Sequence, residues 1–155
     1  MAIWIERKKM IEQPGKKKML LFSVSSNVEL AQNVASNLGT ELSEVERKEF
    51  ASGEIYLRLG ESVRGADCFV LQSHSGDINR TIMEQLLMVD ALKRASAKRI
   101  TAVLPFYPYS RQDKKALPRE PISARLISDM YVAAGVDRMV SIDLHTQQIQ
   151  GFVDQ

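Results

Sequence analysis

Strand-like and helix-like segments alternate along most of the chain. An apolar run at residues 19–24 precedes a helix-like stretch at 28–38, and the polar residues 25–27 between them can cap that helix. Gly39 can end the helix, because glycine readily adopts the left-handed conformation found there. This strand–turn–helix order is typical of folds built on a parallel sheet.

The same alternation continues through the rest of the sequence. Further strands are predicted at residues 68–72, 99–104 and 138–142, a long helix after Asp77, and another helix at 122–134 that ends at Gly135. Two strand-like runs, 45–50 and 55–59, flank Ala51-Ser52-Gly53-Glu54 and predict a hairpin. We therefore predict an α/β fold, a mostly parallel sheet flanked by helices, with ligands bound beyond the carboxyl ends of its strands. The loops concerned are 25–27, 73–79, 105–121 and 143–151.

Helical spacing also predicts which side chains face the core. In the long helix these are Ile82, Leu86 and Val89, with Met83, Leu87 and Leu92 beside them. In the last helix they are Leu126, Ile127 and Met130.

Length and charge limit the classes of protein to consider. The chain has 155 residues, 45% of them hydrophobic, which fits one globular domain at 19–155 after a polar leader at 1–18. A net charge of +2 does not indicate a nucleic-acid partner, and no apolar run has membrane-spanning length. The single cysteine, Cys68, excludes an internal disulfide and fits a reducing cytoplasm.

The loop after the strand at 99–104 has the residue types that bind phosphate. Arg111 offers a planar fork of donors, Lys114 and Lys115 add mobile charges, and Gln112 can both donate and accept, as a purine edge or a ribose requires. The chain has neither of the two common glycine-rich nucleotide motifs, GxxxxGK[ST] and GxGxxG after a strand. A solvated charged loop without a ligand is the alternative interpretation.

Asp143 and His145 follow the last predicted strand and could share one ion. Side chains two apart on an extended backbone lie on the same side. Magnesium prefers oxygen ligands, which favours Asp143 and leaves His145 a water-mediated or phosphate-facing role. Alternatively, Asp143 caps the following turn and His145 donates to a backbone carbonyl. His74 is interpreted as an ordinary loop histidine.

Several motifs together resemble a known family. They are Phe-Ser-Val-Ser-Ser-Asn at 22–27, Glu-Ser-Val-Arg-Gly at 61–65, Ile-Met-Glu at 82–84, Met-Val-Asp-Ala-Leu-Lys-Arg-Ala-Ser-Ala at 88–97, Ser-Arg-Gln-Asp-Lys-Lys at 110–115, Arg-Glu-Pro-Ile at 119–122, Asp-Leu-His at 143–145 and Gln-Ile-Gln-Gly-Phe at 148–152. With these, the sequence resembles the amino-terminal half of ribose-phosphate diphosphokinase, also called phosphoribosyl pyrophosphate synthetase, from about residue 19 to 154.

The resemblance implies an activity and a set of site residues. Family members transfer the diphosphoryl group of ATP to ribose 5-phosphate, with Mg²⁺, and release AMP. Arg111 and Gln112 would bind ATP, and His145 would contribute to the magnesium site with Asp143 in support, which overrides the preference for Asp143 from ligand chemistry. The turn of the hairpin would contact the adenine of a neighbouring subunit's ATP through Phe50, Ser52, Gly53 and Glu54.

The resemblance also implies regulation and assembly. Many family members form homo-oligomers that phosphate activates and ADP inhibits. The candidate residues for such an effector site are Ser62, Arg64, Lys115, Arg119 and Gln150.

The sequence departs from the family pattern in two ways. Ser52 replaces the usual aspartate of the turn, and Pro108 and Pro118 stiffen a loop that is expected to move. The family's second domain, with its catalytic lysine loop and its ribose 5-phosphate loop, resembles no segment of the sequence. We therefore expect no catalytic residue in this half and no diphosphokinase activity from the chain alone. The alternative is a non-catalytic regulatory or assembly module that joins a full-length synthetase.

Overall fold

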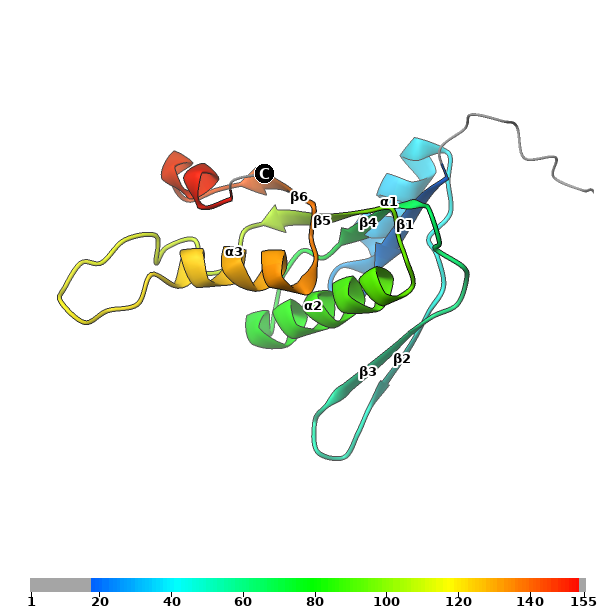
Figure 1. Cartoon of the computed structure of the whole chain (residues 1–155), viewed down its shortest axis with the longest axis horizontal. Coiled ribbons are helices and arrows are strands. Elements are labelled where there is room, and N and C mark those ends of the chain that lie inside the picture. The colour runs from blue at the N-terminus through cyan, green and yellow to red at the C-terminus, as the bar shows by residue number, and fades with distance from the viewer. Residues whose placement is uncertain (1–17, 154–155) are drawn as a thin grey trace, which may run out of the picture.

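A parallel sheet forms the centre of the molecule, as predicted. The computed structural model describes residues 18–153, so the predicted leader at 1–18 lies outside the described residues except for Lys18. Four strands, β1 (Met19–Ser23), β4 (Asp67–Leu71), β5 (Arg99–Phe106) and β6 (Arg138–Asp143), pair in the order β1-β4-β5-β6 (Figure 1). All three pairings are parallel, with Leu71 opposite Val103 and Phe106 opposite Asp143.

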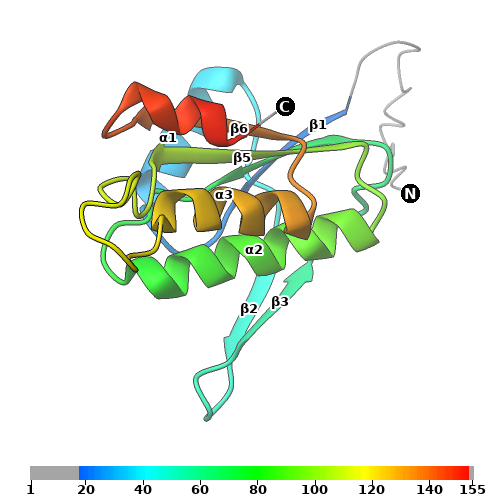
Figure 2. The same ribbon diagram turned by 60° about the vertical axis from the view of Figure 1, so that its left-hand side comes forward.

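Helices cover both faces of this sheet. Helix α1 (Val28–Leu38) lies on one face, and helices α2 (Ile78–Arg94) and α3 (Ser123–Ala134) lie together on the other (Figures 1 and 2). Side chains alternate along β1, so Leu21 packs in a small core with Ala31 and Ala35 of α1, whereas Phe22 belongs to the larger core under α2 and α3. A short 3₁₀ helix, η1 (Gln147–Phe152), follows β6.

The predicted helix ends are confirmed. The side chains of Asn27 and Asp77 accept hydrogen bonds from Leu30 N (3.2 Å) and Arg80 N (3.1 Å), so each caps its helix. Gly135 ends α3 with a φ of 118°, and a Cβ there would lie 2.6 Å from Cδ of Lys93. Only glycine meets both demands without a shift of the neighbouring lysine.

The predicted hairpin is also confirmed. Strands β2 (Val45–Glu49) and β3 (Ile55–Leu59) pair antiparallel in a second, two-stranded sheet that projects away from the main one (Figures 1 and 2). The amide of Phe50 donates to Glu54 O (2.9 Å), the amide of Gly53 donates to Phe50 O (2.9 Å), and Gly53 has a φ of 87°. The turn is therefore tightly closed at the far end of the hairpin.

The predicted helix faces were wrong at two positions. Met83 is 47% exposed and Leu126 is 56% exposed, although both were predicted to face the core. Conversely, Glu84 and Gln85 are completely buried. Helix α2 packs against the sheet, the hairpin and α3, so its buried surface is wider than the single stripe that helical spacing predicts.

Within residues 18–153, no helix combines the length and the apolar character that crossing a membrane requires.

Candidate functional site

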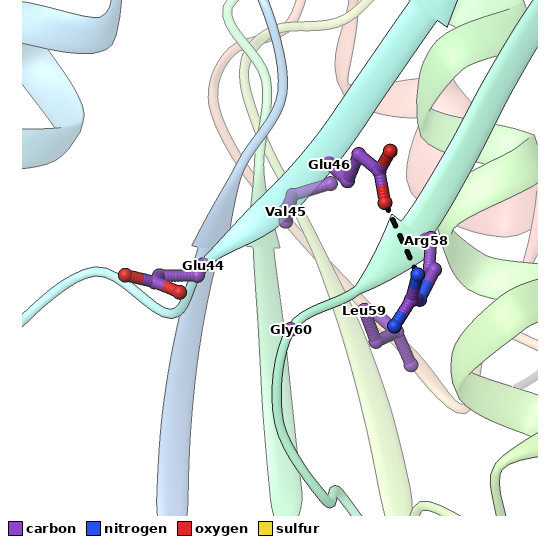
Figure 3. Close-up of a pocket in the computed structure, with 6 residues that line it drawn as sticks. All are labelled: Glu44, Val45, Glu46, Arg58, Leu59 and Gly60. Atoms are coloured by element: carbon purple, nitrogen blue, oxygen red, sulfur yellow. Dashed lines mark hydrogen bonds and ion pairs between the residues drawn. The ribbon is translucent and has the colours of Figure 1, made fainter.

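A surface hollow at the base of the hairpin contains none of the predicted site residues. It is lined by Glu44, Val45, Glu46, Arg58, Leu59 and Gly60 (Figure 3). Across the strands, Arg58 Nη1 bonds to Glu46 Oε2 at 3.4 Å, and the amide of Gly60 donates to Glu44 O at 2.9 Å. The chemistry predicted from the sequence therefore has to be sought at the carboxyl ends of the parallel strands.

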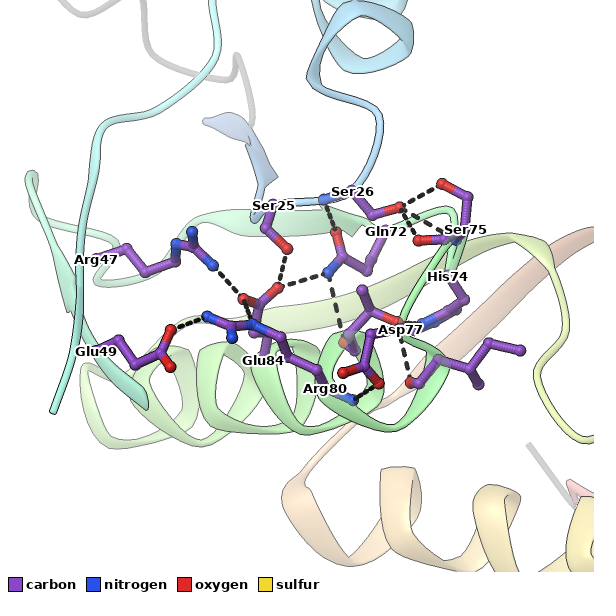
Figure 4. Close-up of polar contacts among 12 residues, drawn as sticks. Ser25, Ser26, Arg47, Glu49, Gln72, His74, Ser75, Asp77, Arg80 and Glu84 are labelled. Atoms are coloured by element: carbon purple, nitrogen blue, oxygen red, sulfur yellow. Dashed lines mark hydrogen bonds and ion pairs between the residues drawn. The ribbon is translucent and has the colours of Figure 1, made fainter. Parts of the chain in front are cut away.

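The loops after β1 and β4 are closed by their own side chains. The hydroxyl of Ser26 lies 2.7 Å from that of Ser73 and 2.9 Å from that of Ser75, and the amide of Ser26 donates to Gln72 Oε1 at 3.1 Å (Figure 4). The amide of Ser75 donates back to the Ser26 hydroxyl at 3.2 Å. These contacts satisfy the polar groups internally, which leaves few donors free for a ligand.

His74 lies in the predicted loop but is buried rather than solvated. It is 2% exposed, in the left-handed conformation with a φ of 54°, and its ring nitrogens contact Thr81 Oγ1 (3.1 Å) and Gln85 Oε1 (3.0 Å). Burial lowers the pKa of His74 to about 4, only partly offset by the Gln85 hydrogen bond. The ring is neutral at pH 7, which agrees with a structural role.

Gln85 fixes the orientation of that ring. Its Nε2 donates to Val70 O at 2.8 Å, so its Oε1 is free to accept from the hydroxyl of Tyr131 (2.7 Å) and from His74 Nε2. The proton of the neutral imidazole is therefore assigned to Nε2, with Nδ1 accepting from Thr81. The sequence reasoning missed this network, because buried glutamine and tyrosine have no signature in helical spacing.

The loop after β5 is held at both ends and along its length. The hydroxyl of Tyr107 donates to Ala124 O at 2.9 Å, and the hydroxyl of Tyr109 bonds to the side chain of Asn79. Within the loop, Glu120 Oε2 accepts from the amides of Ala116 (2.8 Å) and Leu117 (2.9 Å). These bonds give the loop a defined path without using its basic side chains.

Asp113 connects this loop to the loop after β6. Its Oδ2 accepts hydrogen bonds from the side chains of Thr146 and Gln148, and the residue is 6% exposed. The Thr146 hydrogen bond is the main reason that the pKa of Asp113 lies below its usual value. The role of Asp113 was not predicted, although it lies inside a motif that carried the family resemblance.

The basic side chains of the same loop remain unpaired. Arg111, Lys114, Lys115 and Arg119 are all exposed, and none of them forms an ion pair with another residue of the described part of the chain. Gln112 is anchored through its backbone to Ala124 N (3.1 Å) and through its side chain to Ser123. Four cations without an ion-pair partner among the described residues, on one loop, are an arrangement that suits an anion.

Asp143 and His145 lie at the neighbouring strand end. Residue Asp143 is the last of β6, opposite Phe106 in β5, and His145 follows in a bend. The strand thus ends before His145, so the period-of-two argument does not apply to this pair. Both side chains are exposed, and residues 18–153 contain no group of three or more His, Cys, Asp or Glu side chains that could hold a metal.

The remaining predicted residues lie away from this loop. Phe50 is 56% exposed in the hairpin turn, where its ring meets Tyr56 edge to face at 6.4 Å, and the hydroxyl of Ser52 donates to Glu54 Oε2 at 2.7 Å. The hairpin and the loop after β5 point in different directions (Figures 1 and 2). The six candidate ATP residues therefore form two separate groups within one chain.

The five effector candidates are divided as well. Ser62 and Arg64 lie in the segment before β4, at the amino ends of the parallel strands, whereas Lys115, Arg119 and Gln150 follow β5 and β6 at the carboxyl ends. One chain does not bring them together.

Fold and site together define an α/β domain with a loop of exposed cations, unpaired within residues 18–153, at the carboxyl edge of a parallel sheet. A family model described as the N-terminal domain of ribose phosphate pyrophosphokinase matches residues 19–135. The chain therefore belongs to the ribose phosphate pyrophosphokinase family, of which it matches the N-terminal domain.

Individual relatives agree with this assignment. Ribose-phosphate pyrophosphokinase of Corynebacterium glutamicum is 62% identical over 140 residues, which cover 90% of this chain and 43% of the relative. The Mycobacterium tuberculosis protein of the same name is 59% identical over 140 residues, with coverages of 90% and 43%. The crystal structure of phosphoribosylpyrophosphate synthetase from Mycobacterium smegmatis superposes with a TM-score of 0.88 at 59% identity, over 89% of this chain and 46% of that one. The chain thus spans less than half the length of these relatives.

Proposed function

We propose that this chain is the ATP-binding half of an enzyme that transfers the diphosphoryl group of ATP to ribose 5-phosphate, forming phosphoribosyl pyrophosphate and AMP. The observation that carries the proposal is the loop after β5, whose four exposed cations have no ion-pair partner within residues 18–153. They lie at the same sheet edge as Asp143 and His145. The choice of substrates in this proposal rests on membership of the family.

The residues of the loop suit a polyphosphate. The guanidinium of Arg111 can contact two oxygens of one phosphate group at once, and Lys114 and Lys115 can follow the charge as it moves during transfer. Phosphoryl-type transfer depends mainly on positioning and on neutralising charge, which is what such side chains provide. Gln112, anchored by Ser123, is placed to contact the ribose or the base.

Mg²⁺ is the proposed cofactor, with His145 and Asp143 as the residues that would hold it. Two candidate ligands, both exposed, suit an ion that keeps several waters and binds largely through substrate phosphates. When bound, the ion would neutralise phosphate charge. The chain's own contribution is to fix the adjoining loops through the bonds from Thr146 and Gln148 to Asp113.

A complete site is proposed to need more than one copy of the chain. The turn with Phe50, Ser52, Gly53 and Glu54 projects away from Arg111 and Gln112, which supports a contact with the adenine of a neighbouring subunit's ATP in a homo-oligomer (Figure 1). The split between the two groups of effector candidates, Ser62 and Arg64 against Lys115, Arg119 and Gln150, likewise supports a phosphate or ADP site shared between copies.

The sugar site and the catalytic residues are proposed to lie outside this sequence. We therefore predict no ribose 5-phosphate-dependent release of AMP by the chain alone.

The proposed compartment is a reducing cytoplasm. Cys68 is a buried free thiol whose pKa is raised to about 11, mainly by burial.

Titration calorimetry of the chain with Mg-ATP tests the proposal. We expect saturable binding that Arg111→Ala weakens by roughly 30-fold, because a charge-assisted contact is worth about 2 kcal/mol. Arg125→Ala is the matched control, since Arg125 is an exposed arginine whose Nε is paired with Asp129 on α3 at 2.9 Å. Equal losses in both variants would show that this loop is not the ATP site. No binding by the unmodified chain would refute the proposal that this half binds ATP by itself.

A further inference from the structure

The carboxylate of Glu84, a completely buried residue of α2, joins four separate parts of the chain. It accepts hydrogen bonds from Ser25 in the loop after β1, from Arg47 of β2, and from Gln72 Nε2 at the end of β4 at 3.0 Å (Figure 4). Arg80, one turn earlier on α2, approaches it at 3.5 Å. None of the sequence motifs assigned a role to this residue.

Burial makes these contacts necessary rather than incidental. A carboxylate removed from water is strongly unfavourable unless charges and hydrogen bonds compensate it. Here, two guanidinium groups, one hydroxyl and one amide surround the carboxylate. If any one partner moves away, the buried carboxylate loses either a hydrogen bond or a counter-charge, so the four segments are held in one relative position.

The hairpin is the segment that depends most on this arrangement. Arg47 lies in the middle of β2, opposite Leu57, and contacts Glu84 directly. A second link runs from Glu84 through Arg80 to Glu49, the residue before Phe50. The exposed turn lies beyond both links. A small change in the orientation of β2 at Glu84 therefore displaces the turn by a larger distance.

We propose that Glu84 is a positioning residue that fixes the direction in which the β2–β3 hairpin presents its turn. Its consequence for nucleotide binding rests on the proposed function, in which that turn contacts a neighbouring subunit's ATP. The positioning itself does not rest on it.

Hydrogen–deuterium exchange of the 155-residue chain tests the positioning. We expect Glu84→Gln to speed exchange of the amides in residues 45–59 by roughly tenfold, with β4 and β5 unchanged, since exchange reports local opening. Asp90→Asn is the control on the same helix, because Asp90 forms an exposed pair with Arg94 at 2.7 Å. The proposal is overturned if hairpin exchange in Glu84→Gln matches that of Asp90→Asn, or if β4 and β5 open equally.

A pair of variants at Arg47 keeps the test informative even if Glu84→Gln does not fold. Arg47 is 39% exposed, so its replacement disturbs the packing of the core less than a replacement of the completely buried Glu84. Arg47→Met should give the same hairpin-confined increase, and Arg47→Lys, which retains the charge, should restore most of the protection. A normal hairpin in Arg47→Met contradicts the proposal, as does an equal loss in Arg47→Lys, because packing alone would then explain the effect.

Mg-ATP titration of the same variants separates this proposal from the one before it. Faster hairpin exchange with a weaker Mg-ATP affinity in Glu84→Gln supports both. Faster hairpin exchange with an unchanged affinity leaves the positioning role in place and refutes the adenine contact of the turn.

Discussion

The carboxyl edge of the sheet has two halves that treat their polar groups differently. At β1 and β4, the side chains of Ser26, Ser73, Ser75 and Gln72 bond to one another and to buried neighbours. At β5 and β6, Arg111 and its neighbouring cations are exposed and have no ion-pair partner within residues 18–153. We call the first half, whose polar side chains are satisfied within the fold, the closed half, and the second half, whose cations have no ion-pair partner within residues 18–153, the open half. The comparison separates side chains that contribute to stability from side chains that the fold leaves available for a ligand.

The largest effect is expected in the closed half, from Gln85→Met. Gln85 lies on α2 and contacts His74 in the loop after β4. Methionine keeps the volume but removes the amide oxygen that accepts from the Tyr131 hydroxyl and the His74 N–H, and the amide N–H that donates to Val70 O. Each buried group left unpaired costs about 1–3 kcal/mol, so we expect a loss of about 3 kcal/mol or more in the free energy of unfolding, measured with urea. Gln150→Met, at an exposed position of the open half, should change it by less than about 0.5 kcal/mol. Similar values for the two variants would remove the distinction between the halves.

The closed half also predicts a dependence on pH. The pKa of His74 falls from 6.5 to about 4 on folding because the ring is buried. Between these values the unfolded chain binds a proton that the folded chain does not, so stability falls as the pH decreases through this window. We expect a loss of about 2 kcal/mol between pH 7.5 and pH 5.

His74→Asn is the variant that isolates this effect. Asparagine tolerates the left-handed conformation at this position but does not titrate in this range. Urea unfolding should show a smaller difference between pH 7.5 and pH 5 in the variant. An equal difference would assign the pH dependence to other groups.

Periodicity and turn chemistry predicted most of the fold. The strands, the hairpin and both glycine helix ends follow from local patterns, and the structure confirms them. The errors at Met83 and Leu126, and the unforeseen burial of Glu84, have one cause, which is that residues distant in sequence decide what covers a helix. Arg47 and Tyr131, which cover parts of α2, are 37 and 46 residues away from their partners Glu84 and Gln85.

For the candidate site, the sequence indicated the loop with Arg111 and the pair Asp143 and His145 as candidates, because charge and strand ends are visible in it. Their roles stay predictions. It did not reveal that Asp113 connects the two loops, nor that Ser62 and Arg64 lie at the other end of the sheet from Lys115. Those facts depend on the spatial order of the strands.

A smaller effect is expected where the open half is attached to the fold. Asp113→Asn keeps the shape but replaces one acceptor oxygen of the carboxylate with an amide donor. We expect a loss of about 1 kcal/mol in the free energy of unfolding, with faster amide exchange confined to residues 107–121 and 144–152. Faster exchange in β1 or α1 instead would mean that Asp113 supports the whole sheet.

The smallest effect on stability is expected at Arg111. Arg111→Ala removes a side chain that pairs with no described residue, so the free energy of unfolding should change by less than about 0.5 kcal/mol. Arg47→Ala, at another exposed arginine, should cost more, because it leaves the buried carboxylate of Glu84 with one guanidinium fewer. Urea unfolding of the two variants, side by side, compares a cation of the open half with one that is paired to a buried carboxylate, with residue type held constant. If Arg111→Ala is as destabilising as Arg47→Ala, then the Arg111 side chain stabilises the fold. Its lack of an ion-pair partner among the described residues would then be no argument for a bound ligand.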